Sequence, residues 1–258
     1  MDDTLREIKK SIVNMAHYSH ASHVGSALSV ADVLYVIYSK VADITPENLR
    51  DTYRDKVILS KGHASTALYA TLAHVGLMDK SLLDSYYITG GKLPGHLDMT
   101  SVPGVDASTG SLGHGLSLGL GMALADSKHR VFVIMGDGEC DEGSVWEAAM
   151  LLGRLRLQNL TAVVDKNELQ GFGRTADIMA DQNLAERFST FGLDVQEVNG
   201  HDLQQLENAL KKPSDRTKLI ISHSIKGQGV SYMEDQFIWH YKSPDDEQLE
   251  IAFRELSK

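Results

Sequence analysis

The chain has 258 residues, of which 42% are hydrophobic, and it carries a formal net charge of -10. This length and composition are sufficient for one large globular domain with a core of ordinary size. The acidic balance argues against a nucleic-acid partner, because phosphate backbones attract basic proteins.

The remaining bulk features concern the cellular compartment. The single cysteine, Cys140, excludes an internal disulfide and is consistent with a reducing cytoplasm. The N-terminus is charged and helical in pattern, and it lacks the basic start and apolar centre of a signal peptide. No apolar run approaches the roughly 20 residues that span a bilayer. We therefore expect a soluble, cytoplasmic protein without a membrane partner.

Short apolar runs alternate with helical patterns along the chain. The runs predict strands at 57–59, 131–135, 160–164, 193–195 and 218–221, and the other patterns predict helices near 28–41, 64–76, 114–127, 144–156, 181–191, 202–212 and 245–256. Ser29 and Asp32 are candidates to cap the first of these helices. This alternation predicts an α/β fold, a parallel sheet covered by helices on both faces. Because no linker marks a boundary, residues 1–258 are expected to form a single domain.

Polar residues follow two of the predicted strands. The strand at 131–135 runs into Gly136-Asp137-Gly138, and the strand at 160–164 is followed by Asn167 and Leu169. If the strands are neighbours, the Asp137 carboxylate, the Asn167 amide oxygen and the Leu169 main-chain carbonyl converge on one point. Mg²⁺ takes such oxygens together with phosphate and water oxygens. A plain strand-to-helix turn explains Gly-Asp-Gly alone, but the paired asparagine favours a metal–diphosphate site.

Gly-Asp-Gly followed after almost thirty residues by Asn resembles the signature of thiamine diphosphate enzymes. Beyond this motif, the chain is similar to the N-terminal half of transketolase along nearly its full length. The segments that carry the resemblance are 22–25, 59–65, 93–96, 109–115, 136–143, 226–229 and 239–240. Several ordered motifs at the family's spacing are far more specific than any one of them. The resemblance implies the diphosphate-binding (PP) fold of that family, with thiamine diphosphate and Mg²⁺ as cofactors.

The chain has eleven histidines, and most are expected to be packed or surface residues. Those in helical or turn patterns are His17, His20, His74, His129 and His201. Four others, His23, His63, His96 and His240, stand beside glycines in predicted loops, where function is often carried. The resemblance implies that His63 and His240 contact the diphosphate, and that His23 and His96 lie nearer the donor and acceptor sugars.

Other residues of the motifs complete the expected site. Gly110 and Leu112 belong to a glycine-rich stretch that opens a helix, which suits an anion or the polar edge of a ring, although close packing explains it too. The resemblance places Glu142 at a subunit interface near the catalytic glutamate. Lys226 and Arg154 are expected to be solvated or interface charges. The expected cofactor contacts are His63, Gly110, Leu112, Asp137, Gly138, Asn167 and His240. The expected metal ligands are Asp137, Asn167 and Leu169. The expected catalytic residues are His23, His63, His96, His240 and Glu142.

Several positions depart from the family pattern, and one departure is Leu97-Asp98, which follows His96 where relatives often have Pro-Glu. Val24 replaces a common proline, and Tyr241 replaces a common glycine, so that its ring is expected to narrow the substrate funnel. His114 stands where many relatives have glutamine, and we expect it to have a structural role at a helix start.

The resemblance covers only the diphosphate-binding half of a transketolase. The pyrimidine-binding domain, which supplies the catalytic glutamate, and the C-terminal domain have no counterpart before Lys258 and are expected on a partner chain. The sequence thus predicts the N-terminal subunit of a split transketolase, active in an α2β2 complex. It would transfer a two-carbon ketol unit from a ketose or ketose phosphate to an aldose or aldose phosphate.

Two alternatives remain open. One is the alpha subunit of a thiamine-dependent 2-oxoacid dehydrogenase, against which the segments 60–65 and 93–96 argue. The other is a non-catalytic cofactor-binding module, which the retention of Asp137, Glu142, Asn167 and the four loop histidines makes less attractive.

Overall fold

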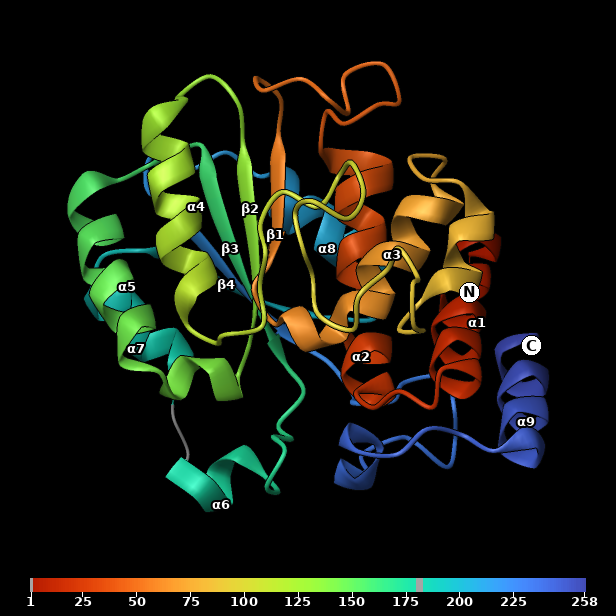
Figure 1. Ribbon diagram of the computed structural model, residues 1–258. Coiled ribbons are helices and arrows are strands. Elements are labelled where there is room, and N and C mark those ends of the chain that lie inside the picture. Colours follow the sequence, from red (N-terminus) through yellow and green to blue (C-terminus); the bar gives the residue numbers. More distant parts are fainter. Residues whose placement is uncertain (1, 180–182) are drawn as a thin grey trace.

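The computed structural model describes residues 2–179 and 183–258, and in it the predicted α/β fold is confirmed (Figure 1). Parallel strands form a five-stranded sheet in the order β1-β2-β3-β5-β4. The strands are β1 (Lys56–Leu59), β2 (Val131–Gly136), β3 (Leu160–Lys166), β4 (Asp194–Asn199) and β5 (Lys218–His223). Each predicted strand is present, and the predicted ends differ from the observed ends by at most four residues.

Helices cover both faces of this sheet. The α-helices of the described residues are α1 (Asp3–Tyr18), α2 (Val24–Val36), α3 (Ser65–His74), α4 (His114–Ala125), α5 (Gly143–Leu155), α6 (Thr175–Met179), α7 (Leu184–Thr190), α8 (Leu203–Lys211) and α9 (Asp246–Leu256). Figure 1 shows α4, α5 and α7 on one side of the sheet and α1, α2 and α3 on the other. The predicted helix at 181–191 corresponds to α7, and residues 181 and 182 lie outside the described residues.

The strands supply both hydrophobic cores by simple alternation. In β2, Phe132 and Ile134 pack against the helices of the N-terminal half, whereas Val133 and Met135 pack against α4 and α5. All four side chains are almost completely buried. This is the pattern expected of a parallel strand with both faces covered, and it explains why the run at 131–135 is apolar without interruption.

Helix α2 begins earlier than the sequence predicts, at Val24, and its N-cap is His23 in a left-handed conformation (φ 72°). Ser29 and Asp32 therefore lie inside the helix, and their predicted capping role is wrong. Tertiary partners explain both residues: the Ser29 hydroxyl donates to Asp165 at 2.6 Å, and Asp32 pairs with Lys9 at 2.8 Å.

The same helix corrects the statement that no apolar run approaches membrane-spanning length. Together with a π-helical turn at Ile37–Val41, α2 forms an 18-residue apolar helix, Val24–Val41, which is long and apolar enough to cross a membrane by length and composition. In this structure 89% of it is buried inside the domain. Its apolar character is that of a central core helix.

The parallel arrangement brings four chain segments to one edge of the sheet. The carboxyl ends of β1, β2, β3 and β5 lead into residues 60–63, 137–142, 167–171 and 224–228. Ligands of open α/β sheets bind at this edge, where the loops converge.

Candidate active site

A cavity of about 270 Å³ lies at the carboxyl edge of the sheet. Of the predicted site residues, it brings together His23, His63, His96, Gly110, Leu112, Asp137, Gly138, Asn167, Leu169 and His240. They come from the start of α2, the tips of β1, β2 and β3, and the loops before α4 and α9. Residues separated by more than 200 positions in the chain thus line one cavity.

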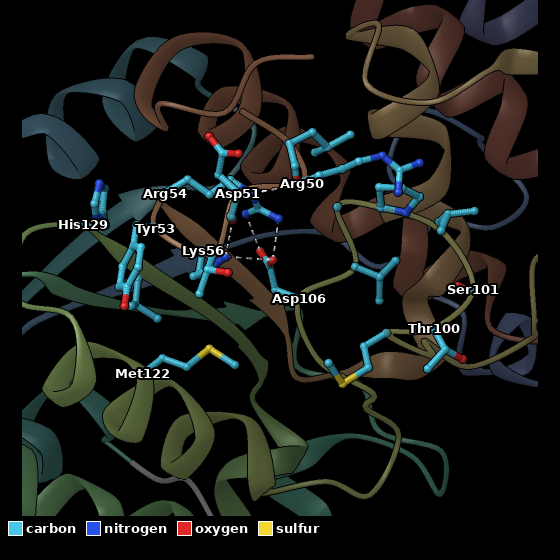
Figure 2. A pocket seen from close by; sticks show the side chains of 18 of the residues that line it. Arg50, Asp51, Tyr53, Arg54, Lys56, Thr100, Ser101, Asp106, Met122 and His129 are labelled. Carbon is cyan, nitrogen blue, oxygen red and sulfur yellow. Dashed lines mark hydrogen bonds and ion pairs between the residues drawn. The ribbon is translucent and has the colours of Figure 1, made fainter. Parts of the chain in front are cut away.

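A larger cavity, of about 980 Å³, lies at the opposite edge of the sheet and contains none of the predicted site residues (Figure 2). Figure 2 shows the Arg54 and Lys56 side chains directed at the Asp106 carboxylate. The Asp106 carboxylate accepts hydrogen bonds from Arg54 at 2.7 and 3.1 Å, and Lys56 lies 3.9 Å away. His129 pairs with Asp126 at 2.6 Å. The smaller cavity is therefore the candidate site, because it contains the convergent polar groups.

Side-chain oxygens that could bind a metal ion occupy one side of the candidate site. Asp137 and Asn167 stand at the tips of β2 and β3, which are hydrogen-bonded neighbours. The Asp137 carboxylate accepts from the amides of Gly138 at 2.8 Å and Glu168 at 2.6 Å. Burial, together with the negative charge of Asp165, raises the pKa of Asp137. A bound cation would offset both effects, so this carboxylate suits a metal ion.

The side-chain amide of Asn167 has a fixed orientation. Its nitrogen donates to the Ser29 hydroxyl at 3.2 Å and to Asp165 at 3.3 Å, and its oxygen accepts from the Leu169 amide at 3.1 Å. The Leu169 carbonyl, the third predicted metal ligand, accepts from the Lys226 ammonium at 3.0 Å. Within the described residues, no three His, Cys, Asp or Glu side chains are grouped so that they could hold a metal ion by themselves. A cation here would therefore also need amide, carbonyl and ligand oxygens.

Two buried lysines form the cationic side of the cavity. Lys61 and Lys226 are each 1% exposed. Lys61 pairs with Asp165 at 2.6 Å, and the Lys226 ammonium lies 3.2 Å from Nδ1 of His240. Burial and the charge of Lys61 lower the pKa of Lys226 to about 8. The expectation that Lys226 is a solvated or interface charge is wrong, because its loop folds back into the site, whereas Arg154 is exposed as expected.

Lys61 has no predicted role in the sequence motifs, but its position carries a signal. Both lysines precede a glycine just after a strand end, in Ser60-Lys61-Gly62 and in Lys226-Gly227. A cation in such a position can approach an anion that binds at the strand tips.

The four predicted site histidines form one group. The His23 ring lies 5.2, 5.8 and 4.7 Å from the rings of His63, His96 and His240, and the rings of His63 and His240 are 5.5 Å apart. Burial is the main cause that lowers the pKa of His23 to about 4 and of His240 to about 3, and the charge of Lys226 adds to it. Burial and Lys61 also hold the pKa of His63 well below its usual range. The imidazoles of His23, His63 and His240 are therefore neutral at pH 7, so each of the three can both donate and accept a hydrogen bond.

The glycine-rich loop before α4 is packed tightly. Gly110 has a φ of 141°, and a Cβ atom there would lie 2.8 Å from the His96 ring. The buried Glu139 carboxylate, to which the sequence pattern gave no role, accepts from the Gly113 amide at 2.8 Å and from the Gly136 amide at 3.2 Å. Close packing is thus part of the reason for these glycines, and contact of Gly110 with a ligand stays a prediction.

Glu142 is the predicted site residue that does not line the cavity. It is exposed, immediately before α5. This position fits the expected interface role, which stays a prediction, but gives no support to a catalytic role within this chain. His114 also lies outside the cavity, where its ring faces the carbonyls of Ser111 and Leu112 at the start of α4, as expected of a structural residue. The histidines expected to be structural, His17, His20, His74, His129 and His201, are likewise outside the cavity.

Tyr241 lines the cavity beside His240. Its hydroxyl donates to the Gly171 carbonyl at 2.6 Å and so connects two loops at the cavity wall. Its effect on the choice of substrate stays a prediction.

Comparisons with known proteins agree with this geometry. The family model described as "Transketolase, thiamine diphosphate binding domain" matches residues 2–251. One of the subunits of apulose-4-phosphate transketolase from Phocaeicola vulgatus is 38% identical over 257 residues, which cover 97% of this chain and 91% of the relative. The SqwG subunit of 6-deoxy-6-sulfo-D-fructose transketolase from Clostridium sp. is 39% identical over 243 residues, which cover 92% and 88%.

Solved structures show the same fold within longer chains. Transketolase from Campylobacter jejuni superimposes with a TM-score of 0.87 at 29% identity. The match covers 99% of this chain but 42% of that one. The chain therefore corresponds to a whole subunit in some relatives and to less than half of the chain in others.

Proposed function

Since this chain belongs to the family of transketolase thiamine diphosphate-binding domains, we propose that it is the N-terminal, diphosphate-binding subunit of a two-chain transketolase. The reaction would move a two-carbon ketol unit from a ketose to an aldose. The observation that carries the proposal is the cavity itself, which places oxygen donors on one side and buried cations and neutral imidazoles on the other. A diphosphate bound through a divalent metal ion needs oxygen ligands for the metal ion and hydrogen-bond donors or cations for its own oxygens.

The residues present fit Mg²⁺ and thiamine diphosphate. Asp137, Asn167 and the Leu169 carbonyl would hold the metal ion, and Lys226 would release that carbonyl to face the diphosphate instead. Lys61 already lies on the cavity floor. A hard carboxylate with a raised pKa, an oriented amide and a main-chain carbonyl are the oxygen ligands that Mg²⁺ prefers. When bound, thiamine diphosphate supplies the carbon nucleophile that carries the two-carbon unit.

The histidines would serve the substrates and the diphosphate. His63 and His240 lie beside the two lysines and would donate hydrogen bonds to phosphate oxygens. His23 and His96 would hold or move a proton at hydroxyl and carbonyl oxygens of the donor and acceptor sugars. Gly110 and Leu112 would line the inner wall.

A partner chain would complete the enzyme. Helices α4 and α5, which lie on the same side of the sheet in Figure 1, expose large apolar side chains. They are Leu118, Leu124, Met150, Leu151 and Leu155. Helix α4 is apolar on all sides, yet only one of its faces is buried within this chain. Such a face marks a protein–protein interface.

We infer that this α4–α5 face contacts a chain that carries the pyrimidine-binding and C-terminal domains. Closed symmetry then favours two copies of each chain. The substrates would be sugars or sugar phosphates, in keeping with the apulose-4-phosphate and sulfofructose named for the relatives. The residues that bind the sugar's anionic tail would lie on the partner.

The test is reconstitution with a chain encoded beside this one in the genome. The purified complex, supplied with Mg²⁺ and thiamine diphosphate, should transfer a ketol unit between sugar phosphates in a coupled assay. Oxidative decarboxylation of a 2-oxoacid without ketol transfer would instead show a dehydrogenase subunit. A complex that binds the cofactor but turns over neither substrate class would indicate the non-catalytic module.

A further inference from the structure

A second group of buried charges lies outside the cavity, between α1, α2 and the turn after β4. Lys9 is 0% exposed and Asp32 is 3% exposed. The Lys9 ammonium lies 2.8 Å from Oδ2 of Asp32, and Nδ1 of His201 lies 3.4 Å from the same oxygen. None of the three residues lines the candidate site. The ketol-transfer function therefore leaves this group without a role.

The hydrogen bond that the His201 ring accepts defines its tautomer. Its Nε2 accepts from the main-chain amide of Ile225 at 2.8 Å, so the ring proton is on Nδ1, which faces Asp32. Burial acts to raise the pKa of Asp32, but the Lys9 ammonium and His201 outweigh it and hold that pKa below its usual value. Asp32 is therefore an ionised carboxylate that attracts two donors at once.

Both donors also hold the same segment of chain, the Ile225–Gln228 turn. His201 binds the Ile225 amide, and the Lys9 ammonium donates to the side-chain oxygen of Gln228. Between these ends, the Gly227 amide donates to the Gly25 carbonyl at 2.9 Å. Gly227 has a φ of 79°, and a Cβ atom there would lie 2.4 Å from the Met233 carbonyl oxygen, so the turn is tightly constrained.

Lys226 is the residue that this turn presents to the cavity. Its ammonium reaches the Leu169 carbonyl at 3.0 Å and lies 3.2 Å from His240. A lysine has several rotatable bonds, and burying its ammonium is unfavourable, so the side chain needs a fixed backbone to stay in the cavity. The Ile225–Gln228 turn supplies that backbone.

We propose that Asp32 is a positioning residue for the cofactor site. Through Lys9 and His201 it holds the Ile225–Gln228 turn, and the turn aims Lys226 at the bound diphosphate. This inference rests on the proposed function, in which Lys226 faces a diphosphate. A buried ion-paired cluster contributes little net stability compared with apolar packing, which favours a role in fixing one conformation of the turn.

The decisive experiment is a double-mutant cycle on the complex with its partner. Asp32→Asn keeps the size of the side chain and removes its charge. Calorimetric titration with thiamine diphosphate and Mg²⁺ should show a Kd raised about ten-fold, the effect typical of losing a residue that orients a ligand-binding group. Lys226→Met should raise the Kd by at least as much. The double variant should bind no more weakly than Lys226→Met alone, because both changes act through one ammonium.

A matched control is available at the opposite edge of the sheet. Asp55 is equally buried and pairs with Arg130 at 2.6 Å, but it lies far from the Ile225–Gln228 turn. Asp55→Asn should leave the Kd unchanged even if it lowers the melting temperature. An equal rise in Kd for Asp55→Asn and Asp32→Asn would show that general destabilisation is the cause and would overturn the positioning role.

A second measurement does not depend on the cofactor. In the cofactor-free complex, Asp32→Asn should speed amide hydrogen exchange at Ile225 and Gly227 relative to Asp55→Asn. If Asp32→Asn does not fold, His201→Ala removes the acceptor for the Ile225 amide and should give the same pattern. Additive effects in the double variant, or unchanged exchange at Ile225, would refute the proposal. An unchanged Kd in Lys226→Met would instead overturn the role given to Lys226 in the proposed function.

Discussion

The ammonium of Lys61, a residue that lines the candidate site, donates a 2.6 Å hydrogen bond to the fully buried carboxylate of Asp165. The same carboxylate accepts from the hydroxyls of Ser29 and Ser224 and from the Asn167 amide. Burial acts to raise the pKa of Asp165, but Lys61 and these donors hold it below its usual value. The Asp165 carboxylate thus orients both the Lys61 ammonium, which we propose faces the diphosphate, and the Asn167 amide, which we propose binds the metal ion.

The metal side leads to the first prediction. Asp137→Ala removes the one carboxylate among the three proposed Mg²⁺ ligands, so it should strongly weaken the binding of thiamine diphosphate while leaving the fold intact. The measurement is calorimetric titration of the complex with and without Mg²⁺. Asp51→Ala, an exposed aspartate at the opposite edge of the sheet, is the control. If Asp137→Ala binds thiamine diphosphate with unchanged affinity, and this affinity does not depend on Mg²⁺, the proposed set of metal ligands is wrong.

The histidine group gives a second prediction. Alanine at His23, His63, His96 or His240 should lower the turnover of the assembled enzyme about ten-fold or more, as expected when a hydrogen-bonding or proton-transfer group is lost. His74→Ala and His129→Ala should not, because His74 binds Ser11 and His129 binds Asp126 outside the cavity. Steady-state kinetics with saturating cofactor provide the comparison. Damage by His74→Ala without damage by His96→Ala would show that the site is elsewhere.

The sequence predicts most of the residues that line the candidate cavity, because the ends of apolar strands can be identified from the sequence. Asp137 and Asn167 come shortly after the mainly apolar runs at 131–135 and 160–164, and parallel strands put such positions at one edge of the sheet. The sequence does not predict the burial of Lys226 or Glu139, because this burial depends on loops that fold back from remote parts of the chain. The sequence pattern places Asp32 at a helix cap for the same reason: its actual partners, Lys9 and His201, are distant in the sequence.

A third prediction concerns the dependence of stability on pH. The pKa of His23 is lowered to about 4 in the folded chain, so between about pH 6.5 and 4 the unfolded chain binds a proton that the folded chain does not. Stability should therefore fall as the pH is lowered through this window, by at most about 1.4 kcal/mol per pH unit for one such group. Urea unfolding at pH 7 and pH 5 measures it.

His23→Gln should lose less stability than the unsubstituted chain between pH 7 and pH 5, because glutamine does not titrate. His129→Gln, outside the cavity, is the matched control and should not reduce the loss in the same way. Parallel pH profiles for the unsubstituted chain and His23→Gln would contradict the buried, neutral state of this imidazole.

The fourth prediction is that two nearby glutamates contribute very differently to the free energy of unfolding. Glu139→Ala leaves the buried amides of Gly113 and Gly136 without an acceptor, at a cost of about 1–3 kcal/mol for each. Glu142→Ala removes an exposed side chain with no cap hydrogen bond, so the isolated chain should change by less than about 0.5 kcal/mol. Chemical denaturation of both variants measures the two changes in the free energy of unfolding. Equal destabilisation would mean that the Glu139 contacts contribute little.

The last prediction is that this chain needs a partner to act as an enzyme. The exposed α4–α5 face and the match to 42% of the Campylobacter jejuni transketolase chain motivate it. The purified chain should show no ketol transfer at any cofactor concentration, and activity should appear as the partner is titrated in. Leu118→Asp places a charge on the apolar face and should shift this titration to at least ten-fold higher partner concentration. Tyr18→Asp, at a more exposed position on α1, should leave the titration unchanged. Steady turnover by this chain alone, free of contaminating partner, would show that all catalytic groups lie within it and would exclude a split enzyme.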